Sequence, residues 1–415
     1  MEVQRDRIFI SAYACEPDLG SEIGVGWHWV LEMSRYFELW VLTRESNRLN
    51  IEKWVNAHQE YASIHFLYFD LPKWMRFWKK GLRGVHFYYY LWQVYSNVIV
   101  KQTMQKYGIE IFHHLTYGNA LWKVSSYGQQ QCFIWGPVGG LETIPAEFSR
   151  YYGYKSRLIE WVRRILVHSI SLNVGFKSRC LNANLILCKT AVTQNRIPLP
   201  YRKKSILFTD VAIEETEWKS ENIQKEAGTT SFLTVGRLDA WRGFDLIIEA
   251  FSKVVALNPD IHLTIVGEGA DKKRLSELIY ERKLESWVIM IGKVDRHHYM
   301  KLLENTDVVI NASLKEGGVT VAFDSLGHGK PLVCMDTTGY TRMLKNDYSV
   351  VIPRDHRPEM IRNLTGVMLQ LTDSVTRTNL GANALQASGR YTWEKHGRDI
   401  HQVIIDAYNV YKSEK

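Results

Sequence analysis

The stretch SFLTVGRLDAWRGFDLIIEAF, residues 231–251, decides the fold. It begins with a short run rich in β-branched and apolar residues, passes through a polar loop that contains two glycines, and continues as an apolar helical pattern. A strand joined to a helix by a short glycine-containing loop is the repeating unit of parallel α/β sheets. The stretch therefore predicts one such unit.

The same rhythm extends in both directions along the chain. Downstream, the strand-like runs are IHLTIVG, VIMIG, DVVINA and PLVCM, and upstream they are RIFIS, LWVLT, IHFLYF, IEIFHH and QCFIW. Two series of alternating strands and helices predict two Rossmann-like, doubly wound α/β domains that face an interdomain cleft. We expect an N-terminal domain over residues 1–208, a second domain over residues 209–390, and a helix over residues 391–415 that packs back on the first domain.

Composition and charge limit the class of protein. With 415 residues, 46% of them hydrophobic, the chain exceeds what one ordinary core supports. The net charge of +8 comes entirely from the first half: residues 1–200 hold 23 Lys and Arg against 15 Asp and Glu, and residues 201–415 hold 29 of each class. A basic first domain predicts an anionic partner or surface.

Cysteine usage and the N-terminal sequence indicate the compartment. The five cysteines are scattered and never stand in C-x-x-C spacing, so neither a disulfide framework nor a zinc cluster is predicted. The first fifteen residues, MEVQRDRIFISAYAC, lack the pattern of a signal peptide, and charged residues interrupt every apolar run before about 18 residues. We expect a cytoplasmic protein without a membrane-spanning segment.

Two arginines follow the first strand of the second domain. Arg237 comes directly after that strand, and Arg242 precedes the apolar helix. Two guanidinium groups at the carboxyl edge of a parallel sheet can fork onto a diphosphate and neutralise it. The alternative is that both are surface salt-bridge partners, of Asp239 and Asp245 respectively.

Two carboxylates bracket a glycine pair in EGGVTVAFDSLGHGKPLV, residues 316–333. Glu316 is expected in the loop after a strand, and Asp324 in the second turn of the helix that follows. Glycines let the backbone approach a ligand, and the free N–H groups at a helix start favour an anion such as phosphate. The alternative is a solvated glutamate and a solvent-facing aspartate.

These motifs carry a family resemblance. VGRLDAWRGFDLIIEAF, IVGEGADKKRL, IMIGKVDRHHYMKLLENTDVVINAS and EGGVTVAFDSLGHGKPLV occur in the order and spacing of the donor domain of retaining family-4 glycosyltransferases of the GT-B fold. ACEPDLGSEIGVGWHW, IFHHLTYGN and WGPVGG resemble a branch of that family common in bacterial surface-polysaccharide assembly. The second domain would then hold a nucleotide-sugar donor, and the first would face the acceptor.

The resemblance implies roles for residues of the second domain. Arg237 and Arg242 would hold the diphosphate, with Arg242 in place of the usual lysine, and Glu316 would face the sugar hydroxyls. Asp324 stands where the family usually has a glutamate that binds the ribose, and Val294 would lie against the base. The remaining donor-binding positions belong to the loop and helix start after Glu316: Gly317, Gly318, Val319 and Thr320.

In the first domain the resemblance implies two glycine-rich cleft loops. One contains Gly20, which would be a further donor-binding residue, and Glu22, and the other contains Gly139 and Gly140. The family's catalytic histidine would correspond to His113 or to His114. The choice between them stays open, because neither stands in the usual H-x-H spacing. Burial of one of them in the sheet is an equal alternative.

The implied reaction is transfer with retention of the anomer by a front-face route. Negative charge builds on the departing diphosphate, and preorganised arginines and helix-start N–H groups stabilise it. The chain contains no D-x-D motif, so we expect no metal and no cofactor. The partners would be a nucleotide-sugar donor and a saccharide or lipid-linked acceptor.

Two basic, aromatic segments suggest a membrane surface. They are PKWMRFWKKGLRGVHFYYYLWQVYS, from Pro72 to Ser96, and KSRLIEWVRRILVHSI, from Lys155 to Ile170. Cations beside aromatic rings suit an interface with anionic lipid, on the inner face of the plasma membrane. The alternative is that both are ordinary helices whose aromatic residues are core. Nucleic acid is not expected, because no recognition module is present.

Three other functions are alternatives to sugar transfer. A catalytically inactive nucleotide-sugar-binding partner of a membrane glycan assembly would share the donor motifs. So would a GT-B sugar-nucleotide epimerase, although it would not need the basic first half. A phosphorylase would need a pyridoxal lysine site, which the sequence does not indicate.

Overall fold

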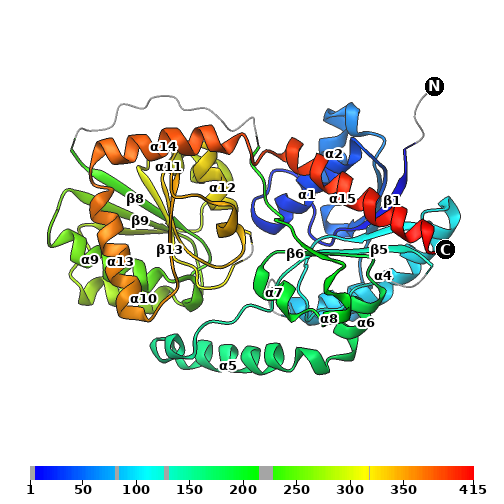
Figure 1. Ribbon diagram of the computed structural model, residues 1–415, viewed down its shortest axis with the longest axis horizontal. Coiled ribbons are helices and arrows are strands. Elements are labelled where there is room, and N and C mark those ends of the chain that lie inside the picture. Colours follow the sequence, from blue (N-terminus) through cyan, green and yellow to red (C-terminus); the bar gives the residue numbers. More distant parts are fainter. Residues whose placement is uncertain (1–4, 80–83, 126–129, 215–227, 317) are drawn as a thin grey trace. The chain divides into compact units, whose positions relative to one another are not determined.

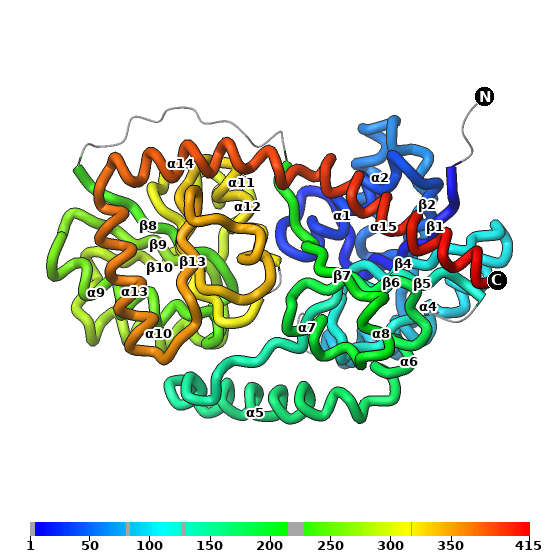
Figure 2. The backbone as a smooth tube through the Cα atoms, in the orientation of Figure 1, coloured from blue at the N-terminus to red at the C-terminus, as the bar shows by residue number. Residues whose placement is uncertain are grey.

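The computed structural model describes residues 5–79, 84–125, 130–214, 228–316 and 318–415 (Figures 1 and 2). The chain forms two compact units, and each is described by itself. Unit 1 comprises Met1–Leu141, His168–Asp210 and Trp393–Lys415, and unit 2 comprises Glu142–Val167 and Val211–Thr392. Each unit contains one parallel sheet flanked by helices, which confirms the predicted pair of doubly wound α/β domains.

Unit 1 is built on a parallel sheet of order β3-β2-β1-β4-β5-β6-β7 among its described residues. The strands are β1 (Arg7–Ser11), β2 (Glu38–Arg44), β3 (His65–Phe69), β4 (Ile111–His114), β5 (Cys132–Val138), β6 (Leu185–Cys188) and β7 (Ser205–Leu207). The helices are α1 (Ser21–Ser34), α2 (Arg48–Ala57), α3 (Lys73–Arg76), α4 (Val85–Tyr107), α6 (Val174–Asn182), α7 (Ala191–Arg196), α8 (Leu199–Arg202) and α15 (Trp393–Ser413). The order of strands reverses between β1 and β4, so this is the switch point where ligands of open α/β sheets bind.

The C-terminal helix α15 packs on α1 of unit 1. Its apolar residues recur at helical spacing, and Ile400, Ile404 and Tyr408 form a buried stripe. Aromatic contacts add to this packing: the Trp29 and His396 ring centroids lie 4.7 Å apart, edge to face. The helix therefore belongs to the core of unit 1.

Unit 2 contains a second parallel sheet, of order β10-β9-β8-β11-β12-β13 in the part that the structure describes. The strands are β8 (Thr230–Val235), β9 (Ile261–Val266), β10 (Val288–Gly292), β11 (Val308–Asn311), β12 (Leu332–Met335) and β13 (Ser349–Ile352). The helices are α5 (Tyr154–His168, whose last residue is assigned to unit 1), α9 (Phe244–Val255), α10 (Lys272–Glu281), α11 (Arg296–Glu304), α12 (Thr320–Gly327), α13 (Arg357–Gln370) and α14 (Ser374–Ser388). Here the switch point lies between β8 and β11.

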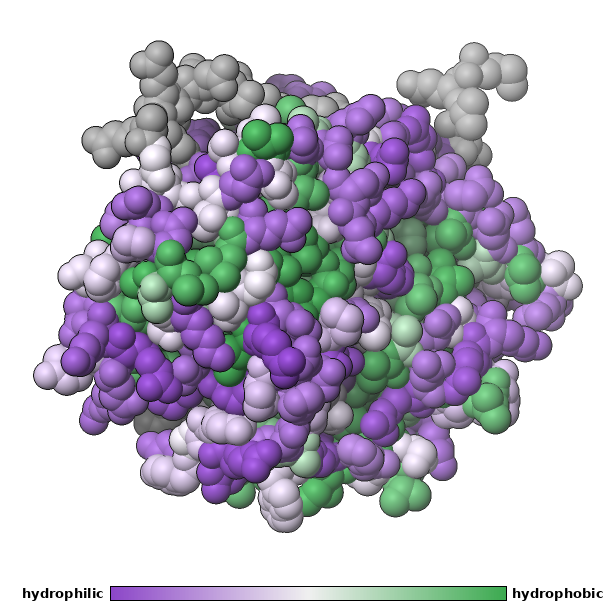
Figure 3. Space-filling model, turned by 60° about the vertical axis from the view of Figure 1, so that its left-hand side comes forward, coloured by the Kyte–Doolittle hydropathy of each residue, from purple (hydrophilic) through white to green (hydrophobic). Residues whose placement is uncertain are grey.

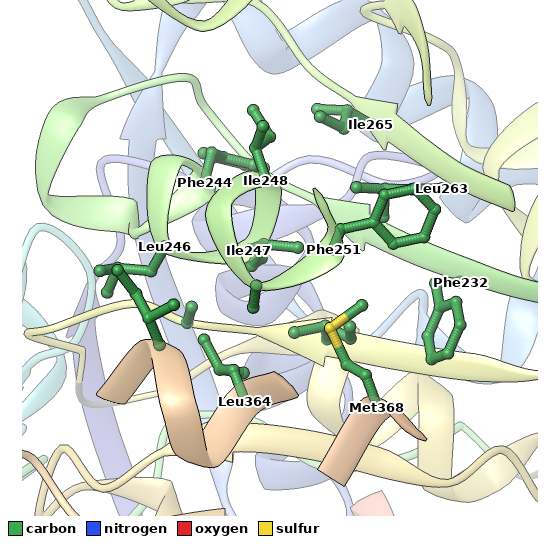
Figure 4. Close-up of a cluster of buried hydrophobic side chains, with 14 of the residues drawn as sticks. Phe232, Phe244, Leu246, Ile247, Ile248, Phe251, Leu263, Ile265, Leu364 and Met368 are labelled. Atoms are coloured by element: carbon green, nitrogen blue, oxygen red, sulfur yellow. The ribbon is translucent and has the colours of Figure 1, made fainter. Parts of the chain in front are cut away.

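The core of unit 2 lies between the sheet and helices α9 and α13 (Figure 4). Apolar residues of α9 recur at helical spacing and bury Phe244, Ile247 and Phe251. Leu364 and Met368 of α13 point toward them, and Phe232 of β8 closes the cluster. This packing fixes both ends of the loop that joins β8 to α9.

Residues 142–167 are part of unit 2, although the sequence predicts a first domain that runs over residues 1–208. Ile144, Phe148 and Tyr152 are buried in the unit 2 core, and the short helix η3 (Ala146–Tyr151) carries Phe148. The helix α5 follows. A boundary drawn at one point of the sequence misses this excursion, because these three buried residues are separated by sequence from the rest of their core.

The helices and the potential ligand side chains bear on the predicted membrane and metal properties. Within the described ranges, no helix combines the length and the apolar character that crossing a membrane requires. In the same residues, no cluster of three or more His, Cys, Asp or Glu side chains is arranged to hold a metal ion. All five cysteines are buried.

Candidate functional site

The loop after β8 carries both arginines that the sequence singled out. Arg237 has a side chain that is 61% exposed, and its Nε donates to Asp239 Oδ2 at 2.6 Å. Arg242 ends the short helix η6 (Ala240–Arg242), and its side chain is mostly buried. The predicted salt bridge to Asp239 is therefore present for Arg237. The predicted salt bridge of Arg242 to Asp245 is not, because Asp245 accepts from Arg357 at 2.6 Å.

Arg242 forms an ion pair with Glu316, the loop carboxylate that follows β11. The structure therefore brings together two of the predicted donor residues, one from each side of the β8–β11 switch point. The Nε atom of Arg242 is buried and has no hydrogen-bond partner among the described residues. A buried donor without a partner is costly unless a ligand uses it.

Gly243 lets this loop pass close to β11. Its φ of 71° lies in the left-handed region, and a Cβ there would stand 2.2 Å from the carbonyl oxygen of Ala312. Only glycine fits such a position. The glycine thus holds Arg242 close to the end of β11 and to Glu316.

The ring of Trp241 is contacted by two cations. The Arg242 guanidinium stands 4.5 Å from its ring centroid, and the Lys315 ammonium stands 5.1 Å from it. Both contacts are within cation–π range. Lys315 also forms a buried ion pair with Glu160 of α5, so the residue just before Glu316 is tied to that helix.

The environment of Lys315 shifts its titration. Burial, together with the nearby Arg163 cation, lowers the pKa of Lys315 from its ordinary 10.5 to about 8, against the opposing effect of the Glu160 carboxylate. Near neutral pH the lysine is still charged. It therefore keeps its ion pair with Glu160 at physiological pH.

Asp324 is buried in α12 and is held by two side chains of α11. Tyr299 donates its hydroxyl to Asp324 Oδ2 at 2.9 Å, and Arg296 Nη1 lies 3.5 Å from the same oxygen. The alternative of a solvent-facing aspartate is wrong, because only 5% of the Asp324 side chain is exposed. Its carboxylate is fixed in orientation by these two partners.

The start of α12 has the features expected of an anion-binding helix end. Val319 is the N-cap residue, and it has no side-chain oxygen with which to cap the first-turn N–H groups of Thr320 and the residues after it. Gly318 and Val294 are half-buried, and Val294 follows β10. Gly317, which was also predicted to bind the donor, lies outside the described residues.

In unit 1, Gly20 and Glu22 stand at the switch point between β1 and β4. Gly20 is the N-cap residue of α1, and the Glu22 carboxylate accepts from the backbone N–H of Tyr117 at 2.7 Å. Burial raises the pKa of Glu22, while the Lys189 cation and the Tyr117 N–H oppose that shift. The carboxylate thus ties the loop after β1 to the loop after β4.

Both histidines of β4 are buried in the sheet of unit 1. His113 is within hydrogen-bond distance of the Gly136 carbonyl oxygen, at 2.7 Å, and His114 of the Tyr89 hydroxyl, at 3.2 Å. Burial lowers the pKa of His113 to about 4 and that of His114 to about 3. The alternative that a histidine is buried in the sheet is therefore observed for both His113 and His114.

The second predicted loop of unit 1 follows β5. Gly139 pairs with Asn119 in an isolated parallel bridge, and Gly140 has a φ of 91°. A Cβ on Gly140 would come within 2.6 Å of the Asn119 side chain. Both glycines therefore serve close packing against the loop after β4.

Sequence reasoning missed several residues of the unit 2 site: Trp241, Lys315, Glu160, Arg296 and Tyr299. Trp241, Lys315, Arg296 and Tyr299 stand inside or beside the quoted motifs, so their positions were visible. Their partners were not, since Glu160 and Lys315 are 155 residues apart in sequence. The one signal in the sequence was Lys315 itself, because a lysine beside a predicted site residue suggests that a carboxylate pairs with it.

Comparison with known proteins shows what the segment that carries Arg242 and Glu316 resembles. Residues 215–386 match the family model "Glycosyl transferases group 1". This segment, called the group 1 segment below, is similar to that family. The group 1 segment contains Arg237, Arg242, Glu316 and Asp324, and the likeness that the quoted motifs predicted is confirmed for this part of the chain.

Individual relatives agree over the same part. The chain is 31% identical over 207 residues to N-acetylgalactosamine-N,N'-diacetylbacillosaminyl-diphospho-undecaprenol 4-alpha-N-acetylgalactosaminyltransferase of Campylobacter jejuni, covering 49% of this chain and 54% of that protein. The chain spans about half the length of the first curated relatives it matches, 55% and 54%. The similarity that is detectable in sequence is therefore concentrated in about half of the chain.

Solved structures extend the likeness to the fold of the whole chain. Sucrose-phosphate synthase from Thermosynechococcus elongatus superposes with a TM-score of 0.65 at 15% identity, covering 98% of this chain and 100% of that one. Alr3699/HepE of Anabaena, in complex with UDP and glucose, gives a TM-score of 0.59 at 13% identity, covering 96% and 99%. Outside the group 1 segment, unit 1 shares this architecture at low sequence identity.

Proposed function

We propose that the chain is a retaining, metal-independent glycosyltransferase that moves a sugar from a nucleotide donor to a saccharide or lipid-linked acceptor in bacterial surface-polysaccharide assembly. The observation that carries the proposal is the Arg242–Glu316 ion pair at the β8–β11 switch point of the group 1 segment. An arginine can donate to the diphosphate, and a neighbouring carboxylate can accept from the sugar hydroxyls, so the pair matches both parts of a sugar diphosphate.

The donor would replace the ion pair with stronger contacts. Arg242 would turn from Glu316 to the diphosphate, and its buried Nε would gain the acceptor that it lacks among the described residues. Glu316 would then be available to the sugar hydroxyls. Arg237 is exposed and can swing from Asp239 to the same diphosphate.

Charge stabilisation would drive the chemical step. As the sugar–phosphate bond breaks, negative charge grows on the departing diphosphate, and the two guanidiniums and the first-turn N–H groups of α12 face that charge. The nucleophile is the acceptor hydroxyl on the same face of the sugar, which gives retention. Asp324, held by Tyr299 and Arg296, would receive the ribose hydroxyls.

The proposed location is the cytoplasmic face of the plasma membrane, reached through residues 72–96 and 155–170. Large apolar side chains of α5 face outward, among them Leu158 and Trp161, while Glu160 of the same helix is buried. Trp74 and Phe77 are even more exposed. A helix that turns large apolar side chains to solvent suits an interfacial lipid contact.

A binding screen tests the proposal. UDP-, GDP- and ADP-sugars are added to the full chain, starting with UDP-glucose because the HepE structure contains UDP and glucose. Ligand binding should raise the melting temperature by mass action, and donor hydrolysis or transfer should proceed in the presence of EDTA. A folded protein that neither binds nor turns over any donor would favour the inactive partner instead.

A further inference from the structure

Unit 1 contains a second charged site, remote in sequence from the loops discussed above. A cavity of about 390 Å³ lies where β2 and β3 end, and α3 and the first turn of α4 complete it. It is in the size range of small-molecule sites. The carboxyl ends of parallel strands are the edge at which such folds bind ligands.

Cations dominate this cavity. Arg44, Lys73, Arg76 and Lys79 line it, and Asp70 is the carboxylate among its lining residues. Asp70 is already occupied, since Arg76 and the Tyr88 hydroxyl both donate to it. This leaves three positive charges in excess, the number that suits a phosphate or diphosphate group.

Two of the cations are held in place by neighbouring aromatic residues. Arg44 Nε donates to the carbonyl oxygen of Tyr13 at 3.1 Å, and its guanidinium lies 4.9 Å from the Tyr13 ring. The Lys79 ammonium lies 4.9 Å from the Tyr88 ring. Among the described residues, neither these two cations nor Lys73 has a carboxylate partner. The cations are therefore positioned in advance but not neutralised.

One exposed aromatic residue lines the cavity, and two more stand next to lining residues in the sequence; together they are called the aromatic border. Phe77 is the lining residue, with 78% of its surface exposed, and Trp74 of α3, which follows the lining residue Lys73, is 73% exposed. Phe87 of α4 is also exposed and lies against Trp78, with ring centroids 5.2 Å apart. A free inorganic anion would make no contact with exposed aromatic side chains. A phosphate attached to a hydrocarbon chain would, because the hydrocarbon can pack against them.

We propose that this cavity binds a phosphate or diphosphate group at the head of a hydrocarbon chain, with the cations holding the phosphate and the aromatic border holding the first part of the chain. That the bound molecule is the acceptor rests on the proposed transferase function. The affinity for the charged head group does not.

Calorimetry on the full chain tests the proposal with three probes: inorganic pyrophosphate, farnesyl diphosphate and farnesol. We expect one unit 1 site for farnesyl diphosphate, weaker binding of pyrophosphate there, and no binding of farnesol. Equal affinity for the two diphosphates would overturn the assignment to a hydrocarbon-borne head group. Binding of farnesol as tight as that of farnesyl diphosphate would overturn the phosphate site altogether.

Paired variants locate the site. K73Q/K79Q should lose at least tenfold in affinity for both diphosphates, and K177Q/K203Q, which removes two exposed charges elsewhere in unit 1, should not. Phe77→Ser should weaken farnesyl diphosphate alone. Unchanged affinity in a folded K73Q/K79Q protein would refute the proposal.

A further pair separates this site from the donor site of unit 2. R237A/R242A should keep the farnesyl diphosphate site while losing stabilisation by nucleotide sugars, and K73Q/K79Q should show the reverse. If R237A/R242A instead abolishes farnesyl diphosphate binding, the diphosphate occupies unit 2 and the unit 1 assignment is wrong. Failure of nucleotide-sugar binding in the unaltered protein would count against the proposed function only.

Discussion

At the scale of single residues, the two arginines after β8 differ in what holds them. Arg242 is mostly buried against Trp241 and Glu316, and Arg237 is exposed with one partner, Asp239. Replacing Arg242 therefore removes packing as well as charge, while replacing Arg237 removes little besides charge. The second substitution is the cleaner probe of diphosphate binding.

We predict that Arg237→Ala leaves the melting temperature nearly unchanged and lowers kcat/KM by about tenfold to hundredfold. Charge-assisted hydrogen bonds contribute about 1.5–3 kcal/mol each, and 1.4 kcal/mol corresponds to about a factor of ten. Thermal unfolding and steady-state kinetics with the best donor of the screen give the two values. Near-normal turnover would contradict a role at the diphosphate.

A second prediction concerns Asp324. Asp324→Asn should raise the donor KM more than it lowers kcat, because a ribose contact is made equally in the ground state and the transition state. Tyr299→Phe is the matched variant, since it removes only the hydroxyl that donates to Asp324, and it should raise KM to a smaller extent. An unchanged KM in both variants would mean that Asp324 serves packing alone.

At the scale of elements, α5 is connected to the donor loop through a buried ion pair. Glu160 of α5 and Lys315 are each more than nine-tenths buried in their side chains. Lys315 immediately precedes Glu316 and lies over Trp241. A displacement of α5 would therefore reach the loop that carries the proposed sugar-binding carboxylate.

The lowered pKa of Lys315 gives a pH-dependent prediction. Between about pH 8 and pH 10.5 the folded chain has released this proton and the unfolded chain still binds it, so stability contributed by this group rises with pH. Relative to Lys315→Met, the free energy of unfolding of the unaltered protein should gain up to about 3 kcal/mol over that window. Urea titrations at pH 7.5 and pH 10 measure the gain, and a difference independent of pH would rule it out.

The outward face of α5 gives a prediction about membranes. Leu158 and Trp161 of α5 are exposed, and Figure 3 shows that hydrophobic side chains reach the surface among hydrophilic ones on the face that it draws. In a flotation assay with phosphatidylglycerol-containing vesicles, L158S/W161S should bind several-fold more weakly than the unaltered protein. Leu257→Ser, which changes another exposed leucine of unit 2, should bind normally. Equal flotation of all three would argue against a lipid contact through α5.

The elements also show what a sequence can and cannot predict here. The strand in SFLTVG and the C-terminal helix from Trp393 were predictable, because alternation and helical periodicity are local properties. Arg242 and Glu316 were predictable from their motifs. The burial of His113 and His114, the partners of Asp324 and the excursion of residues 142–167 were not, because each depends on which distant segment covers the residue.

At the scale of the whole molecule, the two units separate the two proposed ligands. We predict that a nucleotide sugar slows amide hydrogen exchange in the loops after β8 and β11 and at the start of α12, all in unit 2. Farnesyl diphosphate should slow exchange around α3 and the end of β2, in unit 1. Protection of the same unit by both ligands would show that they share one site.

The chain passes from one unit to the other four times, at residues 141–142, 167–168, 210–211 and 392–393. Ribosomal synthesis is vectorial, so unit 1 lacks the buried stripe of α15 until all of unit 2 has been made. Unit 2 in turn uses residues 144–152, which are made before the last strands of unit 1. Neither unit can finish folding as an independent product of translation, and a nascent chain stalled before residue 393 should hold unit 1 in an incomplete, protease-sensitive state.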